Sequence, residues 1–304
     1  MGENFAYKEY LAGLLAGVAT VSIGHPFDTV KVKLQKHNTE AGGIKYKNSL
    51  HCTARILQTE GVKGLYRGAT SSFAGMAFES SLLFGIYSRT KQSLQGGEQS
   101  DEPQPRVIIP SAAYGGALIS FILCPSELVK CRMQVQGTDS LVPKVSRYSG
   151  PIDCALQTVK SDGVTGIFRG GFATFMRESI GNAVFFSVYE YVRYYMHHLQ
   201  LKPSLSDHSN LVDMGIGIVS GGLGGVAFWS AVLPLDVAKT IIQTSQDNSS
   251  TRNPFRVLNT ICRMNGLKGC YTGLGPTIVR AFPANAAAIV TWELAMKMLG
   301  INRN

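Results

Sequence analysis

Pro26-Phe27-Asp28-Thr29-Val30-Lys31 places a proline, an acid and a lysine in one short stretch, and the same arrangement occurs three times. The later copies are Pro125/Glu127/Lys130 and Pro234/Asp236/Lys239, at intervals of 99 and then 109 residues. A glutamine follows nine residues after each proline, at Gln35, Gln134 and Gln243. A motif that returns at a near-constant period indicates an internal repeat, and a repeat decides how the whole fold is interpreted.

A second motif supports the same division of the chain. It reads GVKGLYRG at 61–68, GVTGIFRG at 163–170 and GLKGCYTG at 266–273. Two motifs in the same order, three times over, indicate one structural unit of about 100 residues. We therefore expect repeats at 1–100, 101–205 and 206–304, joined in one transmembrane domain.

The composition indicates a membrane protein. Hydrophobic residues make up 45% of the chain and charged residues only 16%, against about 25% charged in a typical soluble domain. Six apolar stretches, two per repeat, lie at 11–23, 72–87, 108–123, 172–188, 214–233 and 276–291. Several are shorter than the roughly 20 residues of a simple spanning helix. The odd-numbered ones reach full length only if the helix continues through the proline, so its charges must face protein or water.

Other features limit the function classes. Residues 1–10 contain two acids and no apolar run, which argues against a secretory peptide. The six cysteines form no CxxC pair and no zinc spacing, so we expect reduced thiols and no metal. No set of nucleophile, base and orienting group indicates an enzyme. The net charge of +9 suggests anionic lipid, or an asymmetric distribution of charge across the bilayer, before it suggests nucleic acid.

A short amphipathic stretch separates the two apolar stretches of each repeat, at 50–59, 152–161 and 255–264. Apolar residues recur there at helical spacing, so each can lie flat at the membrane interface. The glycines that follow can end these helices and expose backbone amides to an anion. A lipid phosphate and an unoccupied turn are both compatible with this pattern.

The triplicated acid and lysine predict a gate. Proline inside a helix bends its axis, and an acid and a base three residues apart lie on one helix face. Three such helices can close a ring in which every acid meets a neighbour's base: Asp28, Lys31, Glu127, Lys130, Asp236 and Lys239. The second apolar stretches predict a weaker gate at their far ends, where Lys91 would pair with Glu190 and Arg193 with Glu293.

With both motifs in triplicate over the whole chain, the sequence resembles the mitochondrial carrier family. The resemblance implies an all-α membrane protein of the inner mitochondrial membrane, with six transmembrane helices in a pseudo-threefold bundle and short matrix-side helices. It also implies that Gln35, Gln134 and Gln243 brace the matrix gate, and that cardiolipin binds around Gly68, Gly170 and Gly273. One departure is Ile241, where the first two repeats have Lys33 and Arg132; matrix-face contacts of the third repeat are therefore expected to differ.

The residues that break the threefold symmetry indicate the cargo. Aligned on Tyr87, Tyr189 and Trp292, the even stretches place four charges near the bilayer midplane: Glu79, Arg177, Glu178 and Arg280. Charged residues at that depth usually serve function, although Arg177, Glu178 and Arg280 could also form a purely internal network. Two bases and two acids complement a zwitterion with an added cation. An arginine would bind the α-carboxylate, Glu178 the α-amino group and Glu79 the cationic side chain.

Further candidates complete the predicted substrate site. Asn182 and Asn285 could donate neutral hydrogen bonds, and Trp229 could stack on a guanidinium. The pattern resembles plant carriers for basic amino acids of the arginine/ornithine type. The sequence thus predicts a functional monomer that transports arginine, lysine, ornithine or histidine by alternating access, without a cofactor. Both exchange and uniport are compatible with this pattern. The alternatives are a carnitine or acylcarnitine carrier and a lipid-binding or uncoupling protein without a metabolite.

Overall fold

The computed structural model describes residues 2–39, 46–95, 102–136, 148–199, 209–245 and 251–298, and all regular structure in these ranges is helical. At some helical positions, among them Glu79, Asn285 and Glu293, the side chain lies outside the described part.

The described elements follow the predicted order of long, short and long helix in each repeat. The long helices are α1 (Gly2–Thr39), α3 (Ala69–Gln95), α4 (Pro105–Val135), α6 (Gly171–Leu199), α7 (Ser209–Thr244) and α9 (Leu274–Met298). The short ones are α2 (Ser49–Leu65), α5 (Pro151–Asp162) with the 3₁₀ turn η2 (Val164–Phe168), and α8 (Pro254–Cys270). Within the described residues, two segments are apolar enough to span a membrane by composition alone, Pro105–Val135 and Gly215–Thr244.

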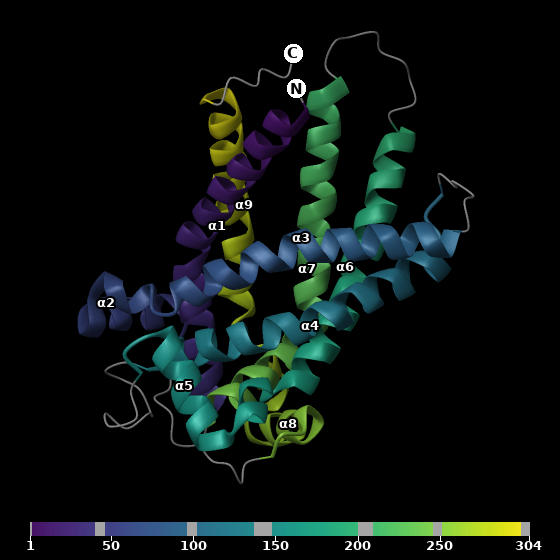
Figure 1. Ribbon diagram of the computed structural model, residues 1–304. Helices are drawn as coiled ribbons and strands as arrows, with labels where there is room; N and C mark the ends of the chain where they lie inside the picture. The colour runs from purple at the N-terminus through teal and green to yellow at the C-terminus, as the bar shows by residue number, and fades with distance from the viewer. Residues whose placement is uncertain are drawn as a thin grey trace.

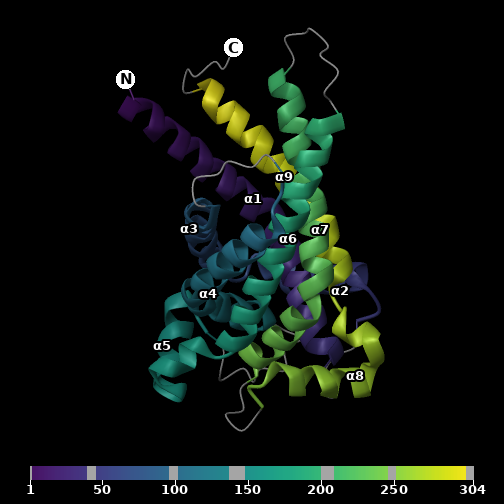
Figure 2. The ribbon, with the colours of Figure 1, turned by 90° about the vertical axis from the view of Figure 1, so that its right-hand side faces the viewer.

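The six long helices pack in a ring. Each contacts its neighbours in the order α1, α3, α4, α6, α7, α9 and back to α1, and α1, α4 and α7 also contact one another. Figure 1 shows α1, α6, α7 and α9 running up the view, with α3 and α4 crossing it. In Figure 2, α5 and α8 lie at the lower end, away from the end where α1 begins and α9 ends. The odd helices therefore meet at the end that carries the short helices.

Prolines lie inside the odd helices without ending them. Pro26 is within α1, Pro125 within α4 and Pro234 within α7, so each helix continues through the motif, as the sequence predicts. A proline removes one backbone hydrogen bond and bends the helix. The charged residues that follow are carried toward the other odd helices, where protein rather than lipid surrounds them.

Glycines with positive φ shape the turn between short and long helix in every repeat. The second of these glycines has φ of 79° at Gly68, 81° at Gly170 and 93° at Gly273, a region that side chains with a Cβ rarely adopt. Each packs on the odd helix of another repeat. A Cβ on Gly68 would lie 3.2 Å from the Lys130 carbonyl oxygen, and one on Gly273 3.0 Å from Lys31 Cγ. The turn of one repeat thus touches the charged segment of another.

Candidate functional site

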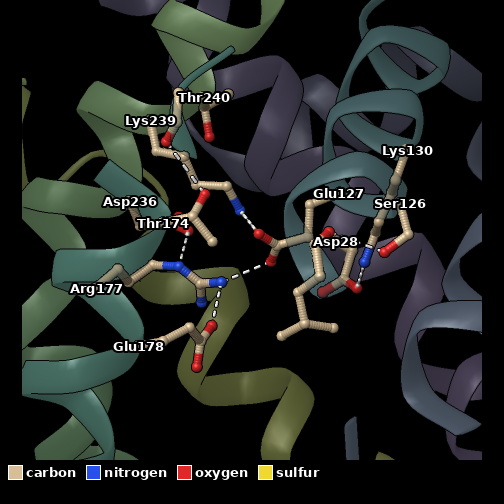
Figure 3. A network of polar contacts seen from close by, with 12 residues as sticks. Asp28, Ser126, Glu127, Lys130, Thr174, Arg177, Glu178, Asp236, Lys239 and Thr240 are labelled. Atoms are coloured by element: carbon tan, nitrogen blue, oxygen red, sulfur yellow. Dashed lines mark hydrogen bonds and ion pairs between the residues drawn. The ribbon is translucent and has the colours of Figure 1, made fainter. Parts of the chain in front are cut away.

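Three ion pairs join the odd helices just beyond their prolines, and Figure 3 shows two of them, Lys130–Asp28 and Lys239–Glu127. Lys130 Nζ lies 2.7 Å from Asp28 Oδ2, and Lys31 Nζ lies 2.8 Å from Asp236 Oδ2. Lys239 contacts Glu127. Each acid meets a base from a different repeat, so the six motif residues form a closed ring between α1, α4 and α7.

Burial makes this ring costly to break. The side chains of Lys31 and Asp236 are 9% and 7% exposed, whereas those of Lys130 and Asp28 are 23% and 15% exposed. Removing one partner of a buried pair leaves an uncompensated charge. The side chains of the α1–α4 pair are more exposed to water than those of the α1–α7 pair, so the α1–α4 pair is easier to separate.

The three glutamines have different partners. Gln35 Nε2 donates to Asp236 Oδ2 at 3.0 Å, and Gln35 Oε1 accepts from the Thr240 hydroxyl at 2.8 Å. Gln134 Nε2 instead reaches the Thr29 hydroxyl at 3.1 Å. The Gln243 side-chain amide is buried and has no hydrogen-bond partner within the described part of the chain. Of the three, Gln35 is the one in direct contact with a ring residue.

Two arginines from even helices also reach the ring. Arg177 Nη2, on α6, lies 2.6 Å from Glu127 Oε1, and Arg280 Nε, on α9, lies 3.1 Å from Asp28 Oδ1. Arg177 also contacts Glu178, and its Nε lies 3.8 Å from Asp236 Oδ1. Figure 3 shows Arg177 between these carboxylates. The arginines predicted for the substrate therefore hold ring acids.

These contacts line a cavity of about 500 Å³, within the usual size range of small-molecule sites. Among the described side chains, its charged lining consists of the six ring residues with Arg177 and Arg280. The predicted ligands Glu178 and Asn182 do not line it. Instead, Asn182 Nδ2 donates to Glu178 Oε2 at 3.0 Å. Glu178 is thus placed to orient Arg177 rather than to face the cavity.

Trp229 also lines the cavity, but its ring is already occupied by a cation. Lys31 Nζ lies 3.8 Å from the ring centroid while it keeps its ion pair with Asp236. Cation–π contacts of this kind are favourable when they are shielded from water. In this state of the protein, Trp229 supports the α1–α7 pair.

At the other end of the bundle, Lys91 and Glu190 form the predicted contact. Lys91 Nζ lies 2.6 Å from Glu190 Oε1, and the Tyr87 hydroxyl donates to the same oxygen at 2.9 Å. The two charged side chains are 25% and 21% exposed. Arg193 lines a second cavity of about 310 Å³ beside them. Its predicted partner Glu293, like the substrate candidates Glu79 and Asn285, lies outside the described side chains.

Sequence reasoning missed a buried ion cluster beside the short helix of each of the first two repeats. Glu60 Oε1 lies 2.6 Å from Lys33 Nζ, and Glu60 Oε2 lies 3.2 Å from Arg67 Nη1. In the second repeat, Asp162 lies 3.4 Å from Arg132 and 3.8 Å from Arg169. The sequence does contain a signal for these clusters. In the first two repeats, an acid directly precedes the first glycine of the second motif, and an arginine directly precedes its last glycine. In the third repeat all three positions are uncharged: Ile241, Asn265 and Thr272.

The clusters also tie one repeat to the next. Arg67 Nη1 donates to the Gln136 carbonyl at the end of α4, at 2.7 Å, and Arg169 Nε donates to the Ile242 carbonyl in α7, at 3.0 Å. Cations near a helix C-terminus satisfy its free carbonyl groups and interact favourably with its dipole.

Comparison with known proteins assigns the class. A family profile described as "Mitochondrial carrier protein" matches residues 2–98, 107–200 and 212–303. The chain therefore belongs to the mitochondrial carrier family.

Individual relatives are similar over nearly their whole length. The chain is 70% identical to the mitochondrial arginine transporter BAC1 of Arabidopsis thaliana, over 100% of this chain and 97% of that protein. It is 34% identical to the mitochondrial basic amino acids transporter of Rattus norvegicus, over 93% and 87% of the two chains. It is also 35% identical to a mitochondrial carnitine/acylcarnitine carrier-like protein of Arabidopsis thaliana, over 97% and 99%.

Proposed function

We propose that this protein exchanges basic amino acids, with arginine foremost, across the inner mitochondrial membrane. The observation that carries the proposal is the pairing of Arg177 with Glu127 and of Arg280 with Asp28 at the base of the cavity. These pairs provide an anion-binding group and a cation-binding group side by side. The 70% identity to a named arginine transporter supports the same substrate class.

A basic amino acid can replace both halves of such a pair. Its α-carboxylate takes the guanidinium of Arg280 or Arg177 in bidentate geometry. Its cationic side chain then faces the carboxylate that the arginine leaves, or Glu79 on α3. Asn182 and Asn285 remain candidate hydrogen-bond donors, and Trp229 remains a candidate for stacking on a guanidinium.

The same replacement connects binding to opening. When the substrate takes a cavity arginine, Asp28 or Glu127 loses one of its two cationic partners, and the matrix ring weakens. A ligand shifts a conformational equilibrium only by its differential affinity for the two states. The cargo must therefore bind the intermediate state, with both gates loosened, more tightly than either open state.

Several properties complete the proposal. The protein acts as a monomer, without metal or cofactor and without enzymatic activity. Cardiolipin is the proposed bound lipid, held where Gly68, Gly170 and Gly273 precede the long even helices. Apolar side chains exposed on the short helices support an interfacial position there, because Leu50 is 80% and Ile152 77% exposed.

The test is counter-exchange in reconstituted vesicles. Labelled arginine should enter vesicles loaded with arginine, lysine, ornithine or histidine and not those loaded with neutral amino acids. Inhibition by acylcarnitine with no response to arginine would favour the carnitine alternative. Proton leak without saturable uptake would favour an uncoupling protein.

The role of Glu79 has its own variant. Glu79→Gln should remove the preference for cationic over neutral side chains, since the carboxylate is the proposed partner of the cargo's second positive charge. Glu102→Gln is the matched control, because Glu102 is an exposed acid just before α4. Unchanged selectivity in Glu79→Gln, with normal uptake, would contradict the assignment.

A further inference from the structure

The short helix α8 reverses direction near its end. Gly266 has φ of 66° and ψ of −169°, which breaks the helix, so the residues after it turn back. A Cβ on Gly269 would lie 2.7 Å from Asn265 Cβ and 2.9 Å from Ile261 Cγ2. The last residues of α8 thus fold onto residues 261–265 of the same helix.

This reversal brings Cys270 beside the turn of α8 that carries Cys262. Cys270 packs in one apolar cluster with Ile261, the residue directly before Cys262, and burial together with the nearby Cys262 thiol raises the pKa of the Cys270 thiol. Cys262 is exposed, whereas Cys270 is 6% exposed. At the matching positions the first repeat has Leu57 and Leu65, and the second has Val159 and Ile167. The thiol pair is therefore specific to the third repeat, where the buried ion cluster is missing.

The pair lies close to the matrix ring. Cys270 packs in one apolar cluster with Ile261 and with Val237 of α7. Val237 directly follows the ring residue Asp236 and precedes Lys239 by two positions. A change in how the end of α8 is held is thus transmitted to α7 at the point where α7 contributes to the gate.

We propose that Cys262 and Cys270 form a reversible disulfide at the matrix face, with a small disulfide such as glutathione disulfide as the oxidant. The Cys262 thiolate attacks one sulfur of the oxidant, forms a mixed disulfide and releases one glutathione thiolate. Cys270 then attacks the Cys262 sulfur and releases the second. The two protein thiols lose two electrons and two protons, and the oxidant becomes two glutathione thiols. This goes beyond the proposed transport activity.

The order of the two steps follows from exposure. Burial raises the pKa of the Cys270 thiol, while Cys262 faces solvent. The accessible thiol therefore reacts first, and the buried one resolves the mixed disulfide. The new covalent bond would hold both sides of the Gly266 turn together, stiffen the support of α7 and slow the opening of the matrix ring.

The experiment has a chemical readout and a transport readout. The purified full chain is treated with glutathione disulfide, and peptides are mapped by mass spectrometry before and after reduction with dithiothreitol. The expected result is a peptide pair joined at 262 and 270, two hydrogens lighter than the reduced peptides. In vesicles, exchange should fall after oxidation and recover after reduction. Cys262→Ser should abolish both effects, whereas Cys154→Ser, a buried cysteine in α5, should retain them.

Each result decides one part of the proposal. Glutathione bound at Cys262 without a link to Cys270 would contradict the disulfide. A mapped disulfide with unchanged exchange would contradict its connection to the gate. If the protein showed no amino-acid exchange at all, the proposed function would fail, but the peptide map would still decide whether the thiol pair is a redox site.

Discussion

The first and third repeats contribute equally to the ion-pair ring but differ in what supports it. In the first repeat, Glu60 is buried between Lys33 and Arg67, and Arg67 reaches the end of α4. In the third, Asn265 Nδ2 donates a hydrogen bond of 3.4 Å to the Asn38 carbonyl of the first repeat, and no ion pair joins the corresponding residues within the described chain. The threefold ring therefore rests on supports of unequal strength, with the neutral one between α8 and α1.

This difference shows where the repeats must have the same charges. They must at the ring, where three helices meet, but they can differ at the ion cluster that lies within a single repeat. A ring needs every member, because one missing lysine leaves a neighbour's acid with an arginine as its remaining cationic partner. The ion cluster within a repeat can be replaced as a whole by neutral residues, because no buried charge is then left without a partner. In the third repeat all three positions are neutral.

The largest expected effect comes from breaking the best-buried ion cluster. Glu60→Gln should destabilise the protein by about 3 kcal/mol, because it leaves Lys33 without its carboxylate partner in a site where both side chains are 1% exposed. The measurement is the apparent unfolding temperature in detergent. Asn265→Ala, at the matching position of the third repeat, is the control and should cost far less. Equal shifts in the two variants would remove the distinction between the two repeats.

The second repeat should lie between the two. Asp162→Asn is expected to cost about 2 kcal/mol, since hydrogen bonds to charged groups are typically worth roughly that much, and its contacts at 3.4 and 3.8 Å are longer than those of Glu60. The same thermal assay applies. A shift larger than that of Glu60→Gln would reverse the predicted order.

The ties between repeats predict a smaller difference. Arg67→Ala should cost about 1 kcal/mol, because it removes a partly exposed ion pair and one bond to the Gln136 carbonyl. Thr272→Ala is the matched change in the third repeat and should be close to neutral, since the Thr272 hydroxyl bonds within its own turn, to the Lys268 carbonyl. A larger loss in Thr272→Ala would show that the neutral support is not the weaker one.

Rebuilding charge in the third repeat gives the smallest expected signal. Asn265→Asp and Thr272→Arg together should be more stable than the sum of the single changes by about 0.5 kcal/mol, a coupling typical of residues in contact. A double-mutant cycle of unfolding temperatures measures it. Strict additivity would mean that the third repeat cannot bring the two side chains together.

Much of this arrangement follows from the sequence. The spacing of Asp28 and Lys31 fixes both on one helix face, and triplication then leaves few alternatives to the ring. The lengths of side chains were harder to anticipate. Alignment placed Arg177 among substrate ligands, but a long guanidinium side chain spans the distance to Glu127. Likewise, the indole of Trp229 makes a cation–π contact with Lys31. This partner lies on another helix, and no local sequence pattern specifies it.

The ion clusters show a different limit of the sequence. Glu60 and Arg67 lie in and beside a motif whose glycines indicated a turn, and no local pattern specified where their charges would lie. Their burial depends on how α2 folds back against α1, which is a tertiary property. Only the substitution of Lys33 by an apolar residue in the third copy, Ile241, indicated that this position differed.

The ring contains three acids and three lysines, so its six side chains carry no net charge. Under the proposed function, the charge that a membrane potential would drive across is that of the cargo. Exchange of one monovalent basic amino acid for another is unaffected by that potential. One-way passage of the same cation would be driven by about 2.3 kcal/mol for each 100 mV. Under the proposed function, the balanced gate leaves the direction of exchange to the concentrations of the two amino acids.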